Sequence, residues 1–319
     1  MLNYTLRSIL MFIPMALVIS FCIFLGMELM PGDAVDYMLS PDALASISPE
    51  DLDEIREELG LNDPFFIRYV RWVYSLIQGD FGYSLQSGVP VSELLATSLP
   101  ATIELSVVAL LTSSVFGSIL GMISALKKGS IADNALSVAG MIGVAIPQFL
   151  FGLLCIVVFA FNLKWLPAGG RLTYGSDLFS DKVRHILLPS AVLGLSLISG
   201  VMRYARSSML DSLNKDYIKT AHSKGLSLWR INFIHGFRVA MTPVVVLIGF
   251  RLPMLIGGAV VVEEIFQWPG VGMLFVAAVR SQNTPVVMMV AFFSVLLVLV
   301  SSLIVDLCTA LLDPRVKLS

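Results

Sequence analysis

The side chains that combine in the most specific way lie in a short polar stretch, residues 214–226, with the sequence NKDYIKTAHSKGL. Asn214 or Asp216 could cap a helix there, and Gly225 could end it in the left-handed conformation. A helix of about ten residues is marginal by itself, so it needs a surface on which to lie. The pattern therefore indicates a recognition helix, whose chemistry would be binding and not catalysis.

Two kinds of surface fit such a helix. Tyr217, Ile218 and Ala221 form an apolar stripe at helical spacing, and three lysines lie around the rest. A basic amphipathic helix can rest on anionic lipid, or it can dock into a groove of another protein. In the second case we expect Ala221 to lie inside the groove. The spacing alone leaves both possibilities open.

The sequence lacks the motifs that would carry catalysis or cofactor binding. It has no G-x-x-x-x-G-K-S/T phosphate loop, so it offers no visible means of binding ATP. His185, His222 and His235 fall in no metal-ligand spacing such as H-E-x-x-H, and no G-x-S-x-G nucleophile elbow has plausible partners. We expect no catalytic residue, no metal and no cofactor in this chain.

Composition identifies the environment of the chain. Of its 319 residues, 56% are hydrophobic and only 14% are charged, and the mean hydropathy is +0.85. A soluble domain has about 25% charged residues, so this chain cannot cover a water-facing surface. The composition excludes a soluble enzyme, a nucleic-acid-binding protein and a disordered protein. It predicts an all-α protein that crosses a membrane several times.

Six stretches are long and apolar enough to span the hydrocarbon layer, which takes about 20 residues. They are residues 8–27, 105–126, 134–163, 186–202, 239–262 and 281–305. Pro147 predicts a kink in the third stretch, and Arg251 is the single charged residue in the fifth. The sequence therefore predicts six transmembrane helices.

The distribution of lysine and arginine predicts the orientation. The loop 203–238 holds seven basic and two acidic residues, Lys127 and Lys128 lie between the second and third spans, and Arg7, Arg315 and Lys317 flank the ends. We expect these regions, with both termini, in the cytoplasm of a cell whose inner membrane holds the protein. The loop 31–99, with three basic and twelve acidic residues, is expected outside.

The segment 31–99 has the signals of a small external subdomain between a first part, residues 1–30, and a core at 100–319. Ser48-Pro49-Glu50-Asp51 predicts a capped helix, and Gly60 could end it. The run 65–77 mixes aromatic residues with arginines, as an interfacial amphipathic helix would.

Several motifs together carry a resemblance to a known family. Residues 214–226 resemble the EAA loop of binding-protein-dependent ABC importers, with Thr220-Ala221, Gly225 and Pro243 at the corresponding positions. The rest resembles the permeases of dipeptide, oligopeptide and nickel systems. The matching motifs are PGD at 31–33, LGLNDP at 59–64, GDFGYS at 79–84, LPATIEL at 99–105, WLPAGG at 165–170, VEEIFQWPGVG at 262–272 and LDPR at 312–315. At 280–283 the chain has RSQN where the family commonly has an acidic pattern.

The resemblance implies one half of the pore of an importer of di- or oligopeptides, with a type I ABC importer permease fold. A second, homologous permease would complete the pore as a heterodimer, and two cytoplasmic ABC ATPases would bind ATP and Mg. An extracytoplasmic binding protein would deliver the substrate, and no nucleic acid is involved. The resemblance also implies an ATPase-coupling helix made of Asp216, Tyr217, Ile218, Lys219, Thr220, Ala221, His222, Lys224 and Gly225.

Other cargo and another mechanism stay open at this point. A nickel importer is the alternative within the family, and glutathione or signalling peptides cannot be distinguished from other peptides. An ion-gradient-driven secondary carrier is the alternative of a different class. Such a carrier needs carboxylates inside the membrane, for which Asp306 is the only clear candidate in the sequence.

Arg251 is the single basic residue expected deep inside a span. Counted along a continuous helix, it lies about 18–20 Å from either end of the fifth span. A midplane arginine costs at least about 2.5–3.5 kcal/mol, so it should face protein or water. It could pair with a carboxylate, or it could line the translocation pathway, where a guanidinium would attract the carboxylate of a peptide.

The predicted orientation can be tested by cysteine labelling in a variant whose three native cysteines have been replaced. A cysteine at position 46 should react with an impermeant reagent in whole cells, because the loop 31–99 is external. A cysteine at position 128, between the second and third spans, is the matched control and should react only after permeabilisation. The opposite pattern would show that the orientation is wrong.

Overall fold

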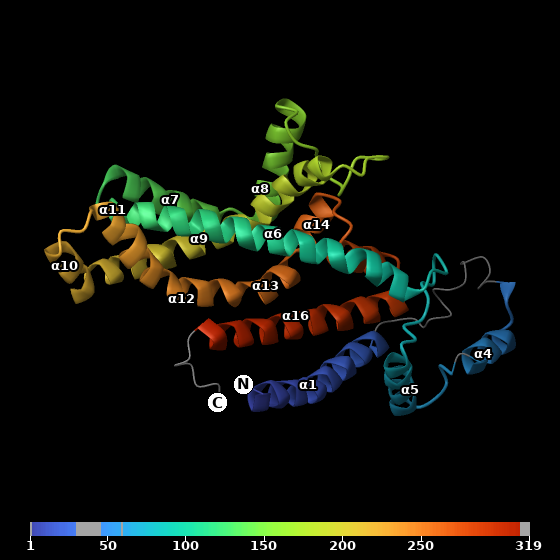
Figure 1. The fold of residues 1–319 in the computed structure, drawn as a ribbon. Helices are drawn as coiled ribbons and strands as arrows, with labels where there is room; N and C mark the ends of the chain where they lie inside the picture. Colours follow the sequence, from blue (N-terminus) through green and yellow to red (C-terminus); the bar gives the residue numbers. More distant parts are fainter. Residues whose placement is uncertain (1, 30–45, 59, 313–319) are drawn as a thin grey trace. The chain divides into compact units, whose positions relative to one another are not determined.

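The computed structural model describes residues 2–29, 46–58 and 60–312. Within these ranges every regular element is a helix, apart from one isolated bridge between Tyr83 and Pro90 (Figure 1). The prediction of an all-α chain is therefore confirmed. The expected motifs PGD at 31–33 and Asp313-Pro314-Arg315, and the terminal Lys317, lie outside the described residues.

The helices follow one another along the whole described chain. They are α1 Leu2–Glu28, α4 Pro49–Glu58, α5 Phe65–Gln78, α6 Val91–Leu126, α7 Ile131–Ala145, α8 Gln148–Cys155, α9 Phe179–Leu213, α10 Asp216–Ser223, α11 Leu228–Arg230, α12 Arg238–Gly249, α13 Arg251–Gly258, α14 Val260–Ile265, α15 Val271–Arg280 and α16 Thr284–Leu312. Two π-helical segments interrupt this series, η1 Ile156–Asn162 and η2 Ile231–Phe237.

Five continuous helical stretches in the described residues are long and apolar enough to cross a membrane, and one of them includes the π-helical segment η2. They are Leu10–Glu28, Val91–Leu126, Phe179–Leu213, Leu228–Gly249 and Thr284–Val305. The pair Ile131–Ala145 and Gln148–Asn162 gives a sixth if the two helices count as one span. The condition is needed because they meet at 104°. Pro147 lies at this bend, where a kink was expected. Ile146 before it is extended, at φ −73° and ψ 125°, as a residue before proline prefers to be.

The expected fifth span at 239–262 is wrong in its position. The continuous helix that is long and apolar enough for a span begins at Leu228 and ends at Gly249, and α13 starts separately at Arg251. Pro253 explains the break, because it has no N–H to donate to the carbonyl four residues earlier, that of Gly249. Arg251 therefore lies at the first residue of a short helix and not halfway along a continuous one.

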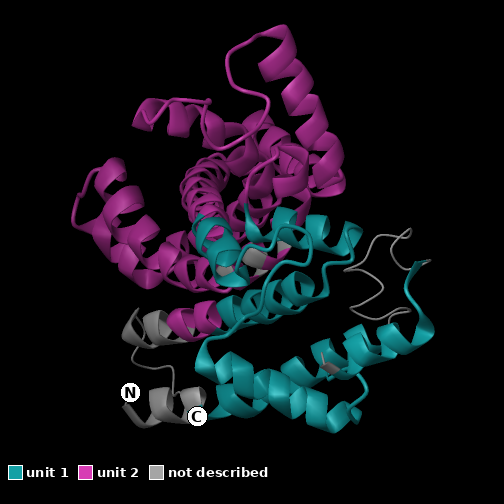
Figure 2. Cartoon of the chain, turned by 90° about the vertical axis from the view of Figure 1, so that its right-hand side faces the viewer, with its two compact units in different colours: residues 1–100, 270–299 teal, residues 101–269, 300–319 magenta. Residues whose placement is uncertain are grey.

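The chain divides into two compact units (Figure 2). Unit 1 comprises Met1–Pro100 and Gly270–Leu299, and unit 2 comprises Ala101–Pro269 and Val300–Ser319. The division runs through the long helices α6 and α16 and does not follow the transmembrane spans.

In unit 1 the helix α5 packs on α1 through aromatic rings. The rings of Phe21 and Phe24 lie 5.4–5.7 Å from those of Phe65 and Tyr69, and the Tyr69 hydroxyl donates to the Leu17 carbonyl at 3.1 Å. Helix α5 thus lies against the membrane-spanning part of α1.

The helix signals expected at Ser48 and Gly60 are also confirmed. The Asp51 N–H donates to Ser48 Oγ at 3.2 Å, so Ser48 caps α4, with Pro49 as its first residue. Gly60 beyond its end has φ +68°, a left-handed conformation that glycine adopts without strain.

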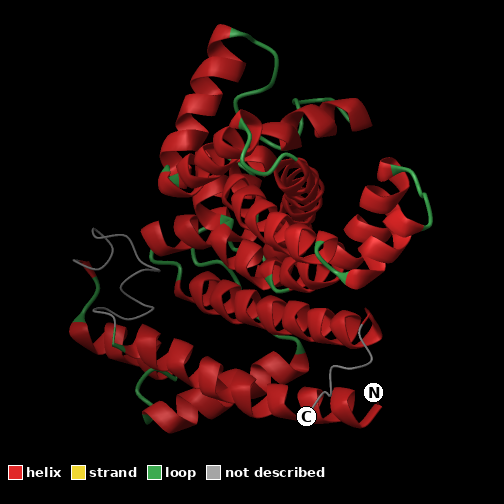
Figure 3. Cartoon of the chain, turned by 90° about the vertical axis from the view of Figure 1, so that its left-hand side faces the viewer, coloured by secondary structure: helices red, strands yellow, loops and turns green. Residues whose placement is uncertain are grey.

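In unit 2 the long helix α9 contacts α7, α8, α12, α13 and α14. Figure 3 shows that loops and turns connect the helices of the chain. Helix α6 contacts α9 as well. Helices α9 and α6 approach closely at Gly194, where a Cβ would lie 3.2 Å from the Ala109 carbonyl oxygen of α6. Gly257 differs, because nothing lies within 4 Å of a Cβ placed on it.

A buried ion pair ties three helices of unit 2 together. The guanidinium of Arg206 in α9 binds both oxygens of Asp133 in α7, each at 2.8 Å. Asp133 is 3% exposed and also accepts hydrogen bonds from Ser124 of α6 and from the backbone N–H of Gly129. The sequence analysis missed this pair, because the fourth span was expected to end at residue 202, whereas α9 continues to Leu213.

Candidate functional site

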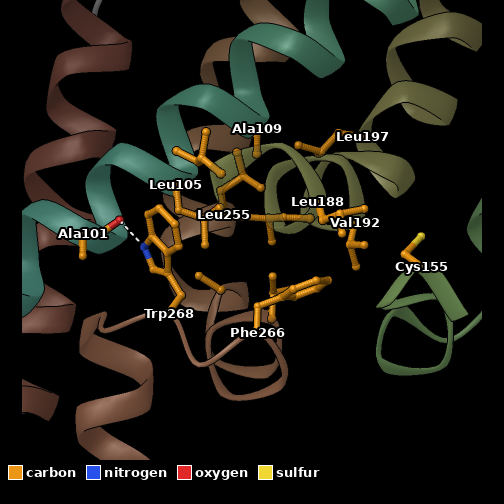
Figure 4. Packing of buried hydrophobic residues seen from close by; sticks show 14 of the residues in the cluster. Ala101, Leu105, Ala109, Cys155, Leu188, Val192, Leu197, Leu255, Phe266 and Trp268 are labelled. Carbon is orange, nitrogen blue, oxygen red and sulfur yellow. Dashed lines mark hydrogen bonds between the residues drawn. The ribbon is translucent and has the colours of Figure 1, made fainter. Parts of the chain in front are cut away.

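Segments from three of the quoted motifs meet inside unit 2. The buried indole of Trp268 donates from Nε1 to the Ala101 carbonyl at 2.8 Å (Figure 4). The N–H of Gly170 donates to the Phe266 carbonyl, also at 2.8 Å. The motifs at 99–105, 165–170 and 262–272 are thus parts of one packed region, with Phe266 and Trp268 in its hydrophobic core.

Charged side chains of the same motifs lie in this region. Glu263 is fully buried and accepts a hydrogen bond from the Thr102 hydroxyl at 2.6 Å. Glu104 accepts one from Nε of Arg171 at 3.0 Å. His185 lies with Nδ1 3.0 Å from the Gly169 carbonyl oxygen, so this histidine supports a loop. Local sequence patterns give no sign of these contacts, because the paired residues are far apart in sequence, as Thr102 and Glu263 are.

Unit 1 contains a similar contact between distant motifs. Asn283, which is buried, donates from Nδ2 to Ser84 Oγ at 2.8 Å and accepts from the Leu85 N–H at 3.2 Å. The asparagine lies where the family commonly has an acidic pattern, and here it fastens the end of the GDFGYS motif.

The helix expected within residues 214–226 is present as α10, an eight-residue helix between α9 and α11. Neither Asn214 nor Asp216 caps it, because the N-cap position belongs to Lys215 and carries no side-chain cap. Asp216 instead accepts a hydrogen bond from Nζ of Lys219 at 2.8 Å. The capping expectation was therefore wrong, whereas the expected helix itself is present.

The end of α10 is fixed by the backbone. The Leu226 N–H donates to the Ala221 carbonyl at 3.3 Å, and the Gly225 N–H donates to the His222 carbonyl at 2.9 Å. These two bonds define a Schellman motif, in which Gly225 takes the left-handed conformation, at φ +71°. The predicted role of Gly225 as the helix stop is confirmed.

Two residues of the apolar stripe of α10, Ile218 and Ala221, face the chain itself, whereas the third, Tyr217, is exposed. Ile218 is 3% exposed and Ala221 is 6% exposed, and both pack against Ile231 with Leu226 beside them. The expectation that Ala221 lies in the groove of another protein is therefore wrong, because its side chain is already buried within unit 2. The surface that α10 leaves exposed is instead made by Asp216, Tyr217, Lys219, Thr220, His222, Ser223 and Lys224.

Helix α10 and the turn between α6 and α7 lie at the same end of unit 2, whereas α8 and α14 lie toward the other end (Figure 1). The last turns of α9 lead directly into α10. A displacement of α10 would therefore act first on the end of α9, which the ion pair of Arg206 with Asp133 joins to α6 and α7.

Arg251 is half-buried at the start of α13. Its Nη2 lies 3.7 Å from the point where a Cβ on Gly200 of α9 would be. The guanidinium thus reaches α9 at a position where the helix has no side chain.

Comparison with known proteins decides the family. The family model described as "Binding-protein-dependent transport system inner membrane component" matches residues 117–318, and the model of the corresponding N-terminal region matches residues 1–106. The chain belongs to this family. It is a multi-pass membrane permease of ABC transport systems, and the family excludes the ion-gradient-driven carrier.

Named relatives extend over the whole permease. It is 41% identical over 319 residues to the oligopeptide transport system permease protein AppB of Bacillus subtilis (strain 168), covering 99% of this chain and 100% of that one. It is 34% identical to the di/tripeptide transport system permease protein DppB of Pseudomonas aeruginosa (strain UCBPP-PA14) and to the glutathione transport system permease protein GsiC of Salmonella typhimurium (strain LT2), with 99% of each chain covered.

A solved structure supports the fold. The permease matches a chain of the inward-facing MetNI methionine ABC transporter with a TM-score of 0.57 at 16% identity. The match covers 70% of this chain and 97% of that chain. At this identity the similarity shows the fold and not the substrate.

The Schellman motif predicts a specific response to substitution at Gly225. Gly225→Val should strain the left-handed conformation by about 1–2 kcal/mol, whereas Gly225→Asn should cost less, since asparagine adopts it more readily. Nothing lies within 4 Å of a Cβ at this position, so a clash does not contribute. Amide hydrogen exchange of residues 216–223 should be faster in the valine variant than in the asparagine variant. Equal exchange in both would contradict the motif.

Proposed function

We propose that this permease forms half of the translocation pore of an ATP-driven importer of di- or oligopeptides. The observation that carries the proposal is the similarity over the full length to permeases named for oligopeptides, di/tripeptides and glutathione, all of which are peptides. A nickel importer is the alternative within the family, and no relative named here supports it.

The proposed assembly contains four further subunits. A second, homologous permease completes the pore as a heterodimer, and two cytoplasmic ABC ATPases bind ATP and Mg. An extracytoplasmic binding protein delivers the peptide. The basic loop 203–238 and both termini then lie in the cytoplasm, as the lysine and arginine distribution supports.

In this assembly α10 is the ATPase-coupling helix. Its buried residues, Ile218 and Ala221, hold it on the permease. The ATPase meets the exposed residues of the helix, including Lys219, Thr220 and His222. Closure of the ATPases would move α10 together with the end of α9 and switch the pore between outward and inward access.

The proposal predicts ATP-driven peptide uptake that does not depend on a proton gradient. The measurement uses the complete transporter, with its partner permease, ATPases and binding protein, in proteoliposomes with a labelled dipeptide, a labelled pentapeptide or nickel ions outside. ATP enclosed with the ATPases should drive uptake of at least one peptide, and a protonophore should leave that uptake unchanged. Uptake of nickel alone would overturn the peptide assignment, and loss of uptake with the protonophore would overturn the ATP-driven mechanism.

We propose further that Arg251 lines the translocation pathway and attracts the C-terminal carboxylate of the peptide. The position of its guanidinium beside Gly200 of α9, in the part of the chain expected within the membrane, supports this role. A structural ion pair with a carboxylate is the competing interpretation.

Arg251→Met should distinguish the two interpretations of this arginine. It should keep assembly and basal ATPase activity, and it should lower uptake of a free-carboxylate peptide more than uptake of the C-terminally amidated analogue. The reason is that only the free peptide loses a charge-assisted partner. Equal loss for both peptides, or loss of assembly, would instead establish a structural pair.

A further inference from the structure

Three elements, α9, α10 and η2, meet at one buried hydroxyl. Ser212, in the last turn of α9, is 5% exposed, and its Oγ donates to the Gly236 carbonyl of η2 at 2.9 Å. The Tyr217 hydroxyl, from the first turn of α10, lies within hydrogen-bond distance of the same Oγ. A serine hydroxyl has one proton, which Ser212 gives to Gly236, so the Tyr217 hydroxyl is the donor to Ser212.

The backbone at Gly236 is shaped for this contact. It belongs to a seven-residue π-helix, and such segments make up well under 1% of residues and occur frequently at functional sites. A Cβ at position 236 would lie 3.1 Å from Cε of Met209 and 3.3 Å from Cδ2 of Leu213, both on α9. The glycine thus lets η2 approach the end of α9 closely enough for Ser212 to reach its carbonyl.

A second serine provides a comparison on the same helix. Ser208, one turn earlier on α9, donates from Oγ to the Ala240 carbonyl of α12 at 2.7 Å. Both serines therefore join α9 to the following membrane helix in the same way. Ser212 differs in that it also accepts the hydrogen bond from α10.

We infer that Ser212 is a positioning residue. It holds the coupling helix to both membrane helices that flank it, by means of a relay of two hydrogen bonds, from Tyr217 to Ser212 and from Ser212 to Gly236. The apolar contacts of Ile218 and Ala221 join α10 only to the side of Ile231 and Leu226. The relay adds a directional contact to α9, so that a movement of α10 reaches both helices together. The inference rests on the proposed function, in which α10 transmits the movement of the ATPases.

The experiment compares single hydroxyl deletions in the complete transporter in proteoliposomes. Tyr217→Phe keeps the ring and removes only the donor, Ser212→Ala removes the centre of the relay, and Ser208→Ala is the matched control. The measured quantity is the number of ATP molecules hydrolysed per peptide transported. We expect this number to rise roughly fivefold in the first two variants, the order expected when one buried hydrogen bond is lost. It should not change in Ser208→Ala.

The relay also predicts how the variants combine. Adding Tyr217→Phe to Ser212→Ala should raise the ratio no further, because both changes interrupt the same chain of hydrogen bonds. An additive effect, an equal effect of Ser208→Ala, or an unchanged ratio in Tyr217→Phe would overturn the inference.

A change on the exposed side of α10 separates this inference from the proposed function. Thr220→Arg should release the ATPases during purification of the complex, because a long charged side chain would stand in the proposed contact between α10 and the ATPase. Thr220 is exposed, and its side chain lies outside the relay. If Thr220→Arg leaves the ATPases bound and uptake normal, α10 is not the coupling helix and the inference fails with it. If Thr220→Arg releases the ATPases but Tyr217→Phe leaves the ratio unchanged, only the relay is overturned.

Discussion

A peptide N–H or C=O group without a hydrogen-bond partner costs several kcal/mol in hydrocarbon, and this constraint accounts for the helical backbone of the membrane spans. Regular backbone satisfies it by forming helices. The irregular segment that ends at Gly170 pairs with another segment, since the Gly170 N–H donates to the Phe266 carbonyl. The Trp268 indole donates in addition to the Ala101 carbonyl of α6. Hydrogen bonds thus join the three motif segments to one another.

Side-chain hydrogen bonds to the backbone also join the helices beside α10, where the π-helical segment η2 leads into α12. Ser208 and Ser212 of α9 donate to carbonyls of the facing helix, one of them within η2. The side chains that complete the backbone bonding are thus also the contacts that join α9 to α12. Both hydroxyls join α9 to the following helix, and Ser212 alone also meets the Tyr217 hydroxyl of α10.

The sequence predicted features that depend on neighbouring residues along the chain. The helix cap at Ser48, the bend at Pro147 and the left-handed Gly225 each follow from one to four adjacent residues, and all three are present. The wrong expectations involve distant partners. The stripe with Ala221 was correctly read as apolar, but periodicity cannot say that Ile231 of the same chain covers it. The fifth span was misplaced because apolar composition continues across the break before Pro253.

The ion pair of Asp133 with Arg206 and the hydrogen bonds of Ser212 near α10 differ in the free energy needed to break them. Separating the buried pair of Asp133 and Arg206 would leave a charge that is 3% exposed without its counter-ion, which costs about 3–5 kcal/mol. A neutral hydroxyl bond contributes about 1 kcal/mol. During a transport cycle the ion pair should therefore stay closed, so that α7 and the end of α9 move as one body. The orientation of α10 relative to that body depends on weaker contacts, and substitutions with small effects on folding can alter it.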